Sequence, residues 1–145
     1  MAIRISSAML SVDAYQDTDG KIHLVNPTNF LSLPTKLRDE MKAAGKKRIG
    51  IPLPIINVLL WGGKEGDVFS LSAAVKSPNG REVGSLAGDQ FSWHEAPFYL
   101  ATIQPQGPVS FEESGTYVVQ LDLNFIPTGV QLPITIYWED ESPPP

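Results

Sequence analysis

Cysteine and long apolar runs are both missing from this chain. Because it contains no cysteine, disulfide bonds, thiolate nucleophiles and cysteine-based zinc sites are excluded. The longest apolar run, residues 55–61, is interrupted by Asn57 and is far shorter than the roughly 20 residues of a membrane-spanning helix. The first residues lack the charged-then-apolar pattern of a secretory signal. We therefore expect a cytoplasmic protein without a membrane segment.

Catalytic motifs are also missing from the sequence. The two histidines, His23 and His94, lie far apart, which is a weak basis for a zinc site or a catalytic triad. Glu95 follows His94, but neighbouring residues on a strand point to opposite faces. No serine lies in a Gly-x-Ser-x-Gly motif, and no glycine-rich loop has the Lys-Ser/Thr pair that binds phosphate. We predict that the protein is not an enzyme and has no cofactor.

The strongest structural signal lies between Glu113 and Phe125. Apolar side chains take alternate positions here: Tyr117, Val119, Leu121, Leu123 and Phe125. The positions between them are mostly polar. This alternation is typical of a β-strand with one buried and one solvated face.

Strong turn signals separate several shorter segments of this kind. Asp19-Gly20 and Ser-Pro-Asn-Gly at residues 77–80 predict two hairpins, and residues 127–129 predict a further turn. Thr35 as N-cap and Gly45 as the first residue beyond the end predict one short helix. The predicted strands cover residues 3–15, 21–25, 55–61, 68–76, 81–86, 98–104, 117–125 and 132–138, with a further short strand at residues 90–94 and a short extension at residues 109–112.

These segments predict an all-β fold. We expect an antiparallel, immunoglobulin-like β-sandwich of about eight or nine strands, with one short helix inserted near residues 35–44 and an irregular loop over residues 26–34. The segment 55–61 is apolar enough to be buried on both faces. Residues 1–139 are expected to form one domain, and residues 140–145 a disordered, acidic and proline-rich tail.

Residues 113–119 carry a motif with a known structural setting. Glu113-x-Gly115-x-Tyr117-x-Val119 resembles the Asp/Glu-x-Gly/Ala-x-Tyr-x-Cys run on strand F of immunoglobulin-like domains. The resemblance implies that the Tyr117 hydroxyl pins a loop to the sheet. Val119 takes the place of the cysteine, so the inter-sheet disulfide is absent, and Trp61 is the candidate for the packing tryptophan.

Over residues 8–138 the chain is similar to a family of uncharacterised bacterial immunoglobulin-like β-sandwich proteins. The shared features are the Asp19-Gly20 hairpin, the loop at residues 30–34, the hairpin at residues 66–80, and a final Gly-x-Tyr strand paired with Leu-Pro-Ile-Thr-Ile. The inserted basic helix, residues 35–48, departs from the compact pattern of the family. The resemblance implies a fold but supplies no functional site.

Basic residues are concentrated in one short window. Six of the eleven basic and two of the sixteen acidic side chains fall in residues 36–48, which gives this window a net charge of +4 and the remainder −9. A solvated helix and loop would explain the window without a function. Alternatively, the basic window has a function, which is contact with an acidic protein or with the acidic face of another copy. Nucleic acid is disfavoured because the remainder is acidic and no aromatic residue lies among the basic ones. The candidate partner-binding residues are Lys36, Arg38, Lys42, Lys46, Lys47 and, on the outer face of the last strand, Tyr137.

Two smaller groups of residues support an alternative function in ligand binding. Trp93, Phe98, Tyr99 and Tyr137 could line a platform for a sugar ring or a protein partner, although rings on strands are commonly core residues. Asp13, Asp17 and Asp19 offer oxygen ligands for Ca²⁺, although aspartate also favours turns through its own hydrogen bonds.

Two functions follow from these residues. The leading prediction is a non-catalytic β-sandwich that acts through protein–protein contacts, as an adaptor or as an assembly subunit that can associate with itself. The alternative is a module that binds carbohydrate or calcium through loops at one end of the sandwich.

Overall fold

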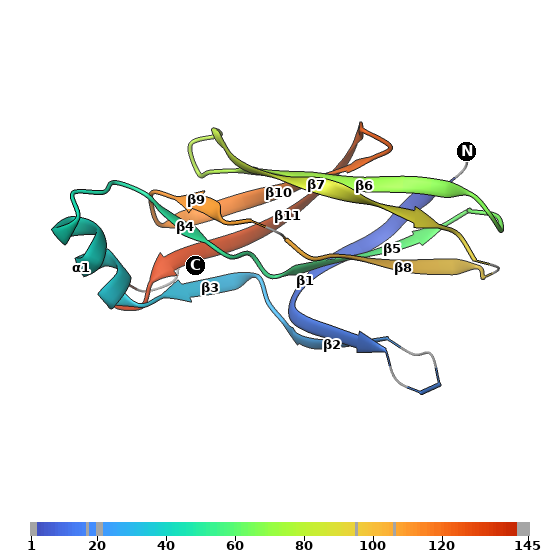
Figure 1. Cartoon of the computed structure of the whole chain (residues 1–145), viewed down its shortest axis with the longest axis horizontal. Coiled ribbons are helices and arrows are strands. Elements are labelled where there is room, and N and C mark those ends of the chain that lie inside the picture. Colours follow the sequence, from blue (N-terminus) through green and yellow to red (C-terminus); the bar gives the residue numbers. More distant parts are fainter. Residues whose placement is uncertain (1–2, 17, 20–21, 95, 106, 142–145) are drawn as a thin grey trace.

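The chain folds as an elongated β-sandwich with one short helix at one end (Figure 1). This confirms the all-β class with a single short helix. The computed structural model describes residues 3–16, 18–19, 22–94, 96–105 and 107–141. For residues 13–16, 22, 24–27, 87 and 88 it describes the backbone alone.

The first sheet is antiparallel throughout. Its strands follow the order β2-β1-β5-β8. Their bounds are Ile22–Pro27 for β2, Arg4–Gln16 for β1, Ile55–Trp61 for β5 and Phe98–Ile103 for β8. The predicted first hairpin is therefore present as β1 and β2, and residues 17, 20 and 21 of its turn lie outside the described residues.

The second sheet has five strands in the order β3-β11-β10-β6-β7. Their bounds are Phe30–Leu33 for β3, Ile126–Trp138 for β11, Gly115–Leu123 for β10, Val68–Lys76 for β6 and Glu82–Ser92 for β7. Strand β3 corrects the prediction of an irregular loop over residues 26–34. It pairs in parallel with the end of β11, a partner about a hundred residues away, so no local pattern could have revealed the strand.

A third, two-stranded sheet continues the pairing of β5 with β8 beyond a break. Strand β4, Ile49–Ile51, pairs with β9, Val109–Phe111. Prolines interrupt both segments between the paired regions β5–β8 and β4–β9. They are Pro52 and Pro54 between β4 and β5, and Pro105 and Pro108 between β8 and β9. Because proline has no N–H to donate, it breaks a β-ladder. The sequence did not predict β4, which connects the helix to the sandwich.

Two further boundaries differ from the predictions. Strand β7 is continuous, whereas two strands were predicted, because a register shift opposite Leu71 and Ala73 adds one residue and interrupts its alternation. The turn between β10 and β11 lies at Asn124 and Phe125, with φ angles of +52° and +64°, and not at residues 127–129, which belong to β11.

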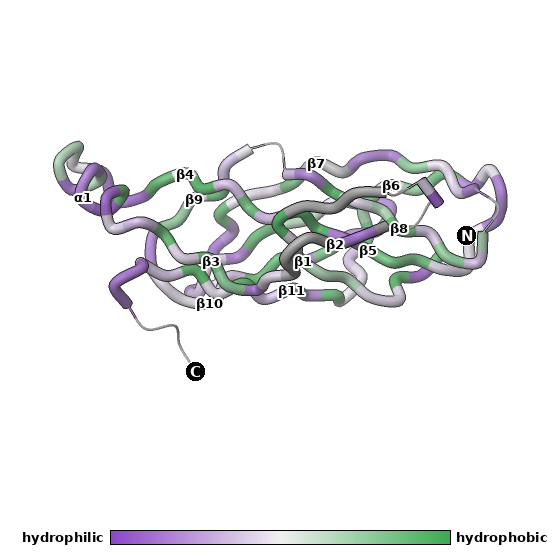
Figure 2. The backbone as a smooth tube through the Cα atoms, turned by 90° about the horizontal axis from the view of Figure 1, so that it is seen from below, coloured by the Kyte–Doolittle hydropathy of each residue, from purple (hydrophilic) through white to green (hydrophobic). Residues whose placement is uncertain are grey.

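The core lies between the two larger sheets and follows the predicted alternation on β10 and β11. Buried side chains include Tyr117, Val119 and Leu121 on β10 and Ile134, Ile136 and Trp138 on β11. In Figure 2 the hydrophobic stretches follow the strands, while the helix is largely hydrophilic. Phe125 is an exception to the prediction, because its place in the turn leaves it 78% exposed.

Trp61 does not pack in the core, whereas Trp93 does. Trp61 is 45% exposed, whereas Trp93 is 1% exposed and lies among core residues. Segment 55–61 is apolar on both faces, so the sequence could not show which face of Trp61 would be covered. The prediction that Trp61 packs the core is therefore wrong.

The hydrogen bond expected of a tyrosine corner is present. The Tyr117 hydroxyl donates to the Glu113 carbonyl oxygen at 2.8 Å, and burial raises the pKa of this hydroxyl. Gly115 has φ +150°, and a Cβ at this position would lie 2.8 Å from Pro78. The motif therefore needs glycine at this position.

Candidate protein-binding site

Helix α1, Thr35–Ala43, lies at one end of the molecule and joins β3 to β4 (Figure 1). Its N-terminus is held by Glu139, which follows β11. The Thr35 N–H and hydroxyl each donate a hydrogen bond to Glu139 Oε1 at 3.0 Å. The N-cap position is occupied by Pro34, which has no side-chain cap, so the predicted capping role of Thr35 is wrong. A carboxylate at this end also complements the helix dipole.

The other end of α1 is closed as predicted by Gly45. This glycine has φ +68°. The Lys46 N–H donates to the Met41 carbonyl oxygen at 2.9 Å, and the Gly45 N–H donates to that of Lys42 at 3.2 Å. This pair of hydrogen bonds is a Schellman motif, in which a left-handed residue satisfies the last carbonyls of the helix. It directs the chain out of α1 toward β4.

Arg38 attaches α1 to the sandwich. Its guanidinium donates two hydrogen bonds to the Asp140 carboxylate, at 3.1 and 2.5 Å, and lies 5.6 Å from the centroid of the Trp138 ring. These hydrogen bonds are the main reason why the pKa of Asp140 is lowered and the pKa of Arg38 is raised. Arg38 is thus engaged within the chain. Asp140, expected in the tail, contacts the helix, and residues 142–145 lie outside the described residues.

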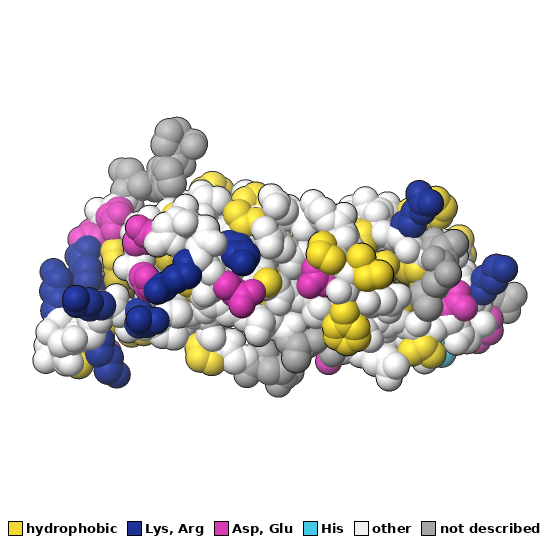
Figure 3. Space-filling view, turned by 90° about the horizontal axis from the view of Figure 1, so that it is seen from above, with side chains coloured by type: hydrophobic (Ala, Val, Ile, Leu, Met, Phe, Trp, Pro, Cys, Tyr) yellow, Lys and Arg dark blue, Asp and Glu magenta, His cyan; other side chains and the backbone are white. Residues whose placement is uncertain are grey.

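The remaining cations at this end form an exposed group. We define the basic surface as Lys36, Lys42, Lys46, Lys47 and Arg48. The four lysines are exposed and form no ion pair within the described part of the chain. Arg48 lies 4.0 Å from Glu112 Oε1, and Arg81 also pairs with this carboxylate. Figure 3 shows Lys and Arg side chains gathered where α1 lies.

Helix stability explains only part of this charge. Lys42 lies in the last turn, where a cation complements the partial negative charge of the helix end. Lys36 lies in the first turn, where a cation opposes the dipole and no acidic residue of that turn balances it. Lys46 and Lys47 follow Gly45 and lie outside the helix. Lys36 therefore does not stabilise α1 through its dipole, and Lys46 and Lys47 lie beyond its last turn.

A groove of about 320 Å³ lies between α1 and β4. Its apolar lining consists of Leu37, Met41 and Ala44 from the helix segment and Ile49 from β4. Its charged lining consists of Lys46, Arg48 and Glu40. No residue of α1 is fully buried, so the apolar stripe of the helix remains partly open to this groove.

Tyr137 points away from the core, as predicted. It alternates with the buried Ile136 and Trp138 and is itself half-buried. Trp138 contacts Arg38 from the other face of the strand, because neighbouring residues point to opposite faces. Tyr137 and α1 therefore lie on different sides of β11, and the structure does not bring Tyr137 into the basic surface.

Two of the four predicted platform rings, Trp93 and Tyr99, belong to an aromatic cluster inside the sandwich. The Trp93 ring centroid lies 5.6 Å from that of Tyr99 and 6.2 Å from that of Phe69. The Trp93 Nε1–H donates to the Ala96 carbonyl oxygen at 3.0 Å. Because Trp93 is almost fully buried, it is removed from the surface candidates. Tyr99 is half-buried.

An exposed aromatic pair lies elsewhere, on the outer face of the first sheet. Trp61 of β5 and Phe98 of β8 are cross-strand neighbours and are 45% and 55% exposed. The sequence analysis named Phe98 as a platform ring but missed Trp61, because strand alternation alone does not show which face of an apolar strand remains uncovered.

The structure adds little to the predicted calcium site. Asp17 and the side chain of Asp13 lie outside the described residues, and Asp19 is exposed. Among the residues whose side chains are described, no three acidic or histidine side chains are grouped so that they could hold a metal ion.

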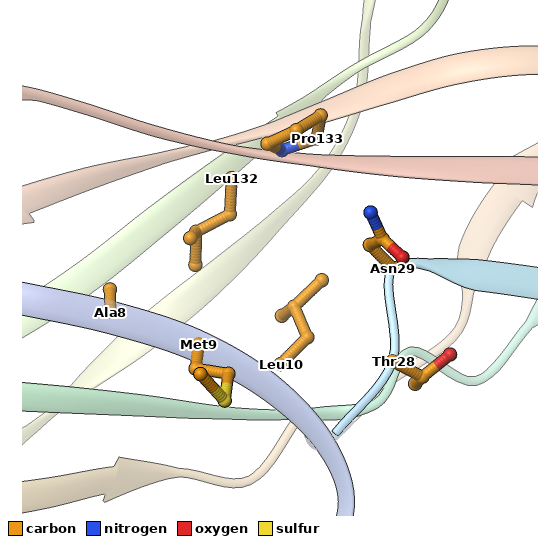
Figure 4. Close-up of a pocket in the computed structure, with 7 residues that line it drawn as sticks. All are labelled: Ala8, Met9, Leu10, Thr28, Asn29, Leu132 and Pro133. Carbon is orange, nitrogen blue, oxygen red and sulfur yellow. The ribbon is translucent and has the colours of Figure 1, made fainter. Parts of the chain in front are cut away.

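A second pocket, of about 310 Å³, lies between β1 and β11 (Figure 4). Leu10 and Leu132 point into it from the two strands, and Thr28 and Asn29 lie at one side. None of its lining residues titrates, so the pocket itself has no group for acid–base catalysis.

No protein-family model and no curated protein matches the chain. The resemblance to an uncharacterised β-sandwich family therefore stays a prediction. Within the described chain, no helix has the length and apolar character to cross a membrane.

Proposed function

We propose that this protein is non-catalytic and acts through protein–protein contacts, as an adaptor or as a subunit of an assembly. The observation that carries the proposal is the basic surface, whose four lysines are exposed without an ion pair in the described structure. The proposal includes the cytoplasmic location expected from the sequence, which cell fractionation tests.

The distribution of charge supports a partner that is acidic. The window that contains the basic surface has a net charge of +4, while the rest of the chain has −9. Complementary charge accelerates and orients the encounter of two proteins. Another copy of the chain also offers acidic surface, and contact between the basic end of one copy and the body of the next would be a head-to-tail interface.

Charge reversal at α1 tests the proposal. We would compare the wild-type chain with Lys36→Glu/Lys42→Glu and with a matched control, Arg4→Glu/Lys64→Glu, which reverses two exposed charges away from α1. Each tagged chain is incubated with lysate from cells that make the protein, at low and moderate salt, and each is also examined by sedimentation velocity.

The expected result is that proteins retained by the wild type, or its self-association, are lost with the α1 variant and kept with the control. Both should weaken as salt rises, because exposed charges are screened. Identical retained proteins and identical sedimentation for the three chains would contradict the proposal.

One observation favours a second function, the binding of carbohydrate. Trp61 and Phe98 form an exposed pair on the outer face of the first sheet, and flat aromatic faces stack on sugar rings. A carbohydrate ligand would change tryptophan fluorescence in the wild type but leave the Trp61→Ala variant unchanged. A panel of sugars without any response would argue against this function.

A further inference from the structure

We propose that the groove between α1 and β4 binds an extended acidic peptide segment of a partner protein. In this complex one apolar side chain of the peptide sits against Leu37, Met41 and Ile49, and its carboxylates lie beside Lys46 and Arg48. The inference rests on the proposed function and names the chemical class of the partner.

The apolar part of the groove is open enough for a side chain. Leu37 and Met41 lie on the face of α1 that packs toward the core, yet both remain partly exposed. The groove volume of about 320 Å³ falls at the lower end of the range of about 300–1,000 Å³ typical of ligand pockets. Burying an apolar side chain of a partner here would cover surface that the chain itself leaves in contact with water.

The cations of the groove are available to carboxylates. Lys46 has no ion pair in the described structure, and Arg48 is held only at 4.0 Å from Glu112. Because Glu112 also pairs with Arg81, Arg48 can turn toward a ligand without leaving this carboxylate alone. Glu40 lines the groove as well, so peptide carboxylates are disfavoured near it and favoured near Lys46 and Arg48.

These features fit a peptide better than a nucleic acid. Proteins that bind single-stranded nucleic acid combine cations with aromatic rings on which bases stack. The groove has aliphatic walls, no aromatic lining residue and one carboxylate. A leucine-like side chain flanked by Asp or Glu matches all of these elements.

The test uses synthetic peptides and fluorescence anisotropy with the full chain. The first labelled peptide is acidic with a central leucine, and the second replaces that leucine with glycine. A third keeps the leucine but replaces Asp and Glu with Asn and Gln, and a labelled single-stranded oligonucleotide is the fourth probe. The leucine peptide with acidic residues should bind roughly 10-fold to 100-fold more tightly than the glycine peptide, the range expected for burying one leucine.

Two matched variants separate the contribution of the groove to peptide binding from that of the positive charge around it. Ala44→Phe fills the groove without changing charge, and Ala44 is exposed with φ −88° and ψ −2°, which suits any L-residue. Ala43→Phe adds the same ring at an exposed helix position that does not line the groove. Ala44→Phe should reduce the affinity for the acidic leucine peptide to that of the glycine peptide, and Ala43→Phe should leave it unchanged.

Several outcomes would overturn the inference. These are equal binding of the leucine and glycine peptides, unchanged binding by Ala44→Phe, and binding of the oligonucleotide as tight as that of the acidic leucine peptide. If the peptides fail while Lys36→Glu/Lys42→Glu still loses partners from the lysate, the groove is wrong and the proposed function stands. If that variant keeps every partner as well, both are wrong.

Discussion

Replacing Tyr117 with phenylalanine should lower the free energy of unfolding by about 1–3 kcal/mol. The Tyr117 ring is fully buried, so the change keeps its packing and removes only the hydroxyl. That hydroxyl donates to the Glu113 carbonyl oxygen at 2.8 Å and accepts from the N–H groups of Glu112 and Glu113 at 3.3 and 3.4 Å. The estimate corresponds to one good hydrogen bond and two weak ones, lost from main-chain groups that the fold partly shields from water.

Urea unfolding, followed by tryptophan fluorescence, measures this difference. Tyr99→Phe is the matched control, because the Tyr99 hydroxyl has no hydrogen bond in the described structure and the residue is half-buried. We expect the control to remain within about 0.5 kcal/mol of the wild type. If Tyr117→Phe is as stable as Tyr99→Phe, the tyrosine corner does not stabilise this fold.

The wild type and Tyr117→Phe should also differ in how their free energy of unfolding changes at alkaline pH. Burial raises the pKa of Tyr117 in the folded chain above the value of about 10 in the unfolded chain. The native state therefore holds a proton that the unfolded chain releases, and stability falls as pH rises above about 10. Tyr117→Phe lacks this contribution, so the difference in unfolding free energy between wild type and variant should be constant below about pH 10 and shrink as the pH rises above it. A gap independent of pH would contradict the burial of this hydroxyl.

Three further changes test other parts of the structure. A Cβ on Gly63 would overlap the Trp93 ring, whereas Gly107 faces open space, so Gly63→Ala should lower the unfolding free energy by about 1–3 kcal/mol and Gly107→Ala by less than about 0.5 in urea unfolding. Phe125 has φ +64° and is largely exposed. Glycine adopts this left-handed conformation without strain, so Phe125→Gly should raise the free energy of unfolding in urea by about 1 kcal/mol. A lower free energy of unfolding would show that the Phe125 ring packs against the fold. Glu139→Ala removes the contacts that hold the start of α1 and should lower the unfolding free energy by about 1 kcal/mol, with Glu139→Gln between the variant and the wild type.

Local patterns in the sequence predicted the parts of the fold that depend on neighbouring residues. The alternation around Tyr117 predicted β10 and its buried face, and Gly45 predicted the end of α1. The hydrogen bond of Tyr117 was predicted from a short motif, because its donor and its acceptor, Tyr117 and Glu113, lie within the same five residues. In each case the controlling contacts lie close together along the chain.

The differences arose where distant segments decide the structure. Strand β3 exists because it pairs with β11, and the cap of α1 comes from Glu139, more than a hundred residues after Thr35. Trp61 and Trp93 exchanged their expected roles because burial depends on which face of a strand the rest of the chain covers. Local periodicity does not contain this information.

The candidate site was predicted only in part. The lysines of the basic surface were visible in the sequence as a charged window, but the use of Arg38 as an anchor to Asp140 was not. The groove could not be predicted, because it forms only where β4 lies beside α1. A short strand such as β4, with prolines immediately after it, carries no alternation long enough to recognise.

Site-specific photo-cross-linking in living cells tests the central claim most directly. A photo-reactive residue would replace Ala43, next to the basic surface, and in a second protein it would replace Ser85, exposed on β7. Binding through the basic surface predicts a discrete cross-linked product from position 43, with a partner or with another copy, and none from position 85. No product from position 43, or the same product from both positions, would contradict the claim that the protein acts through contacts at α1.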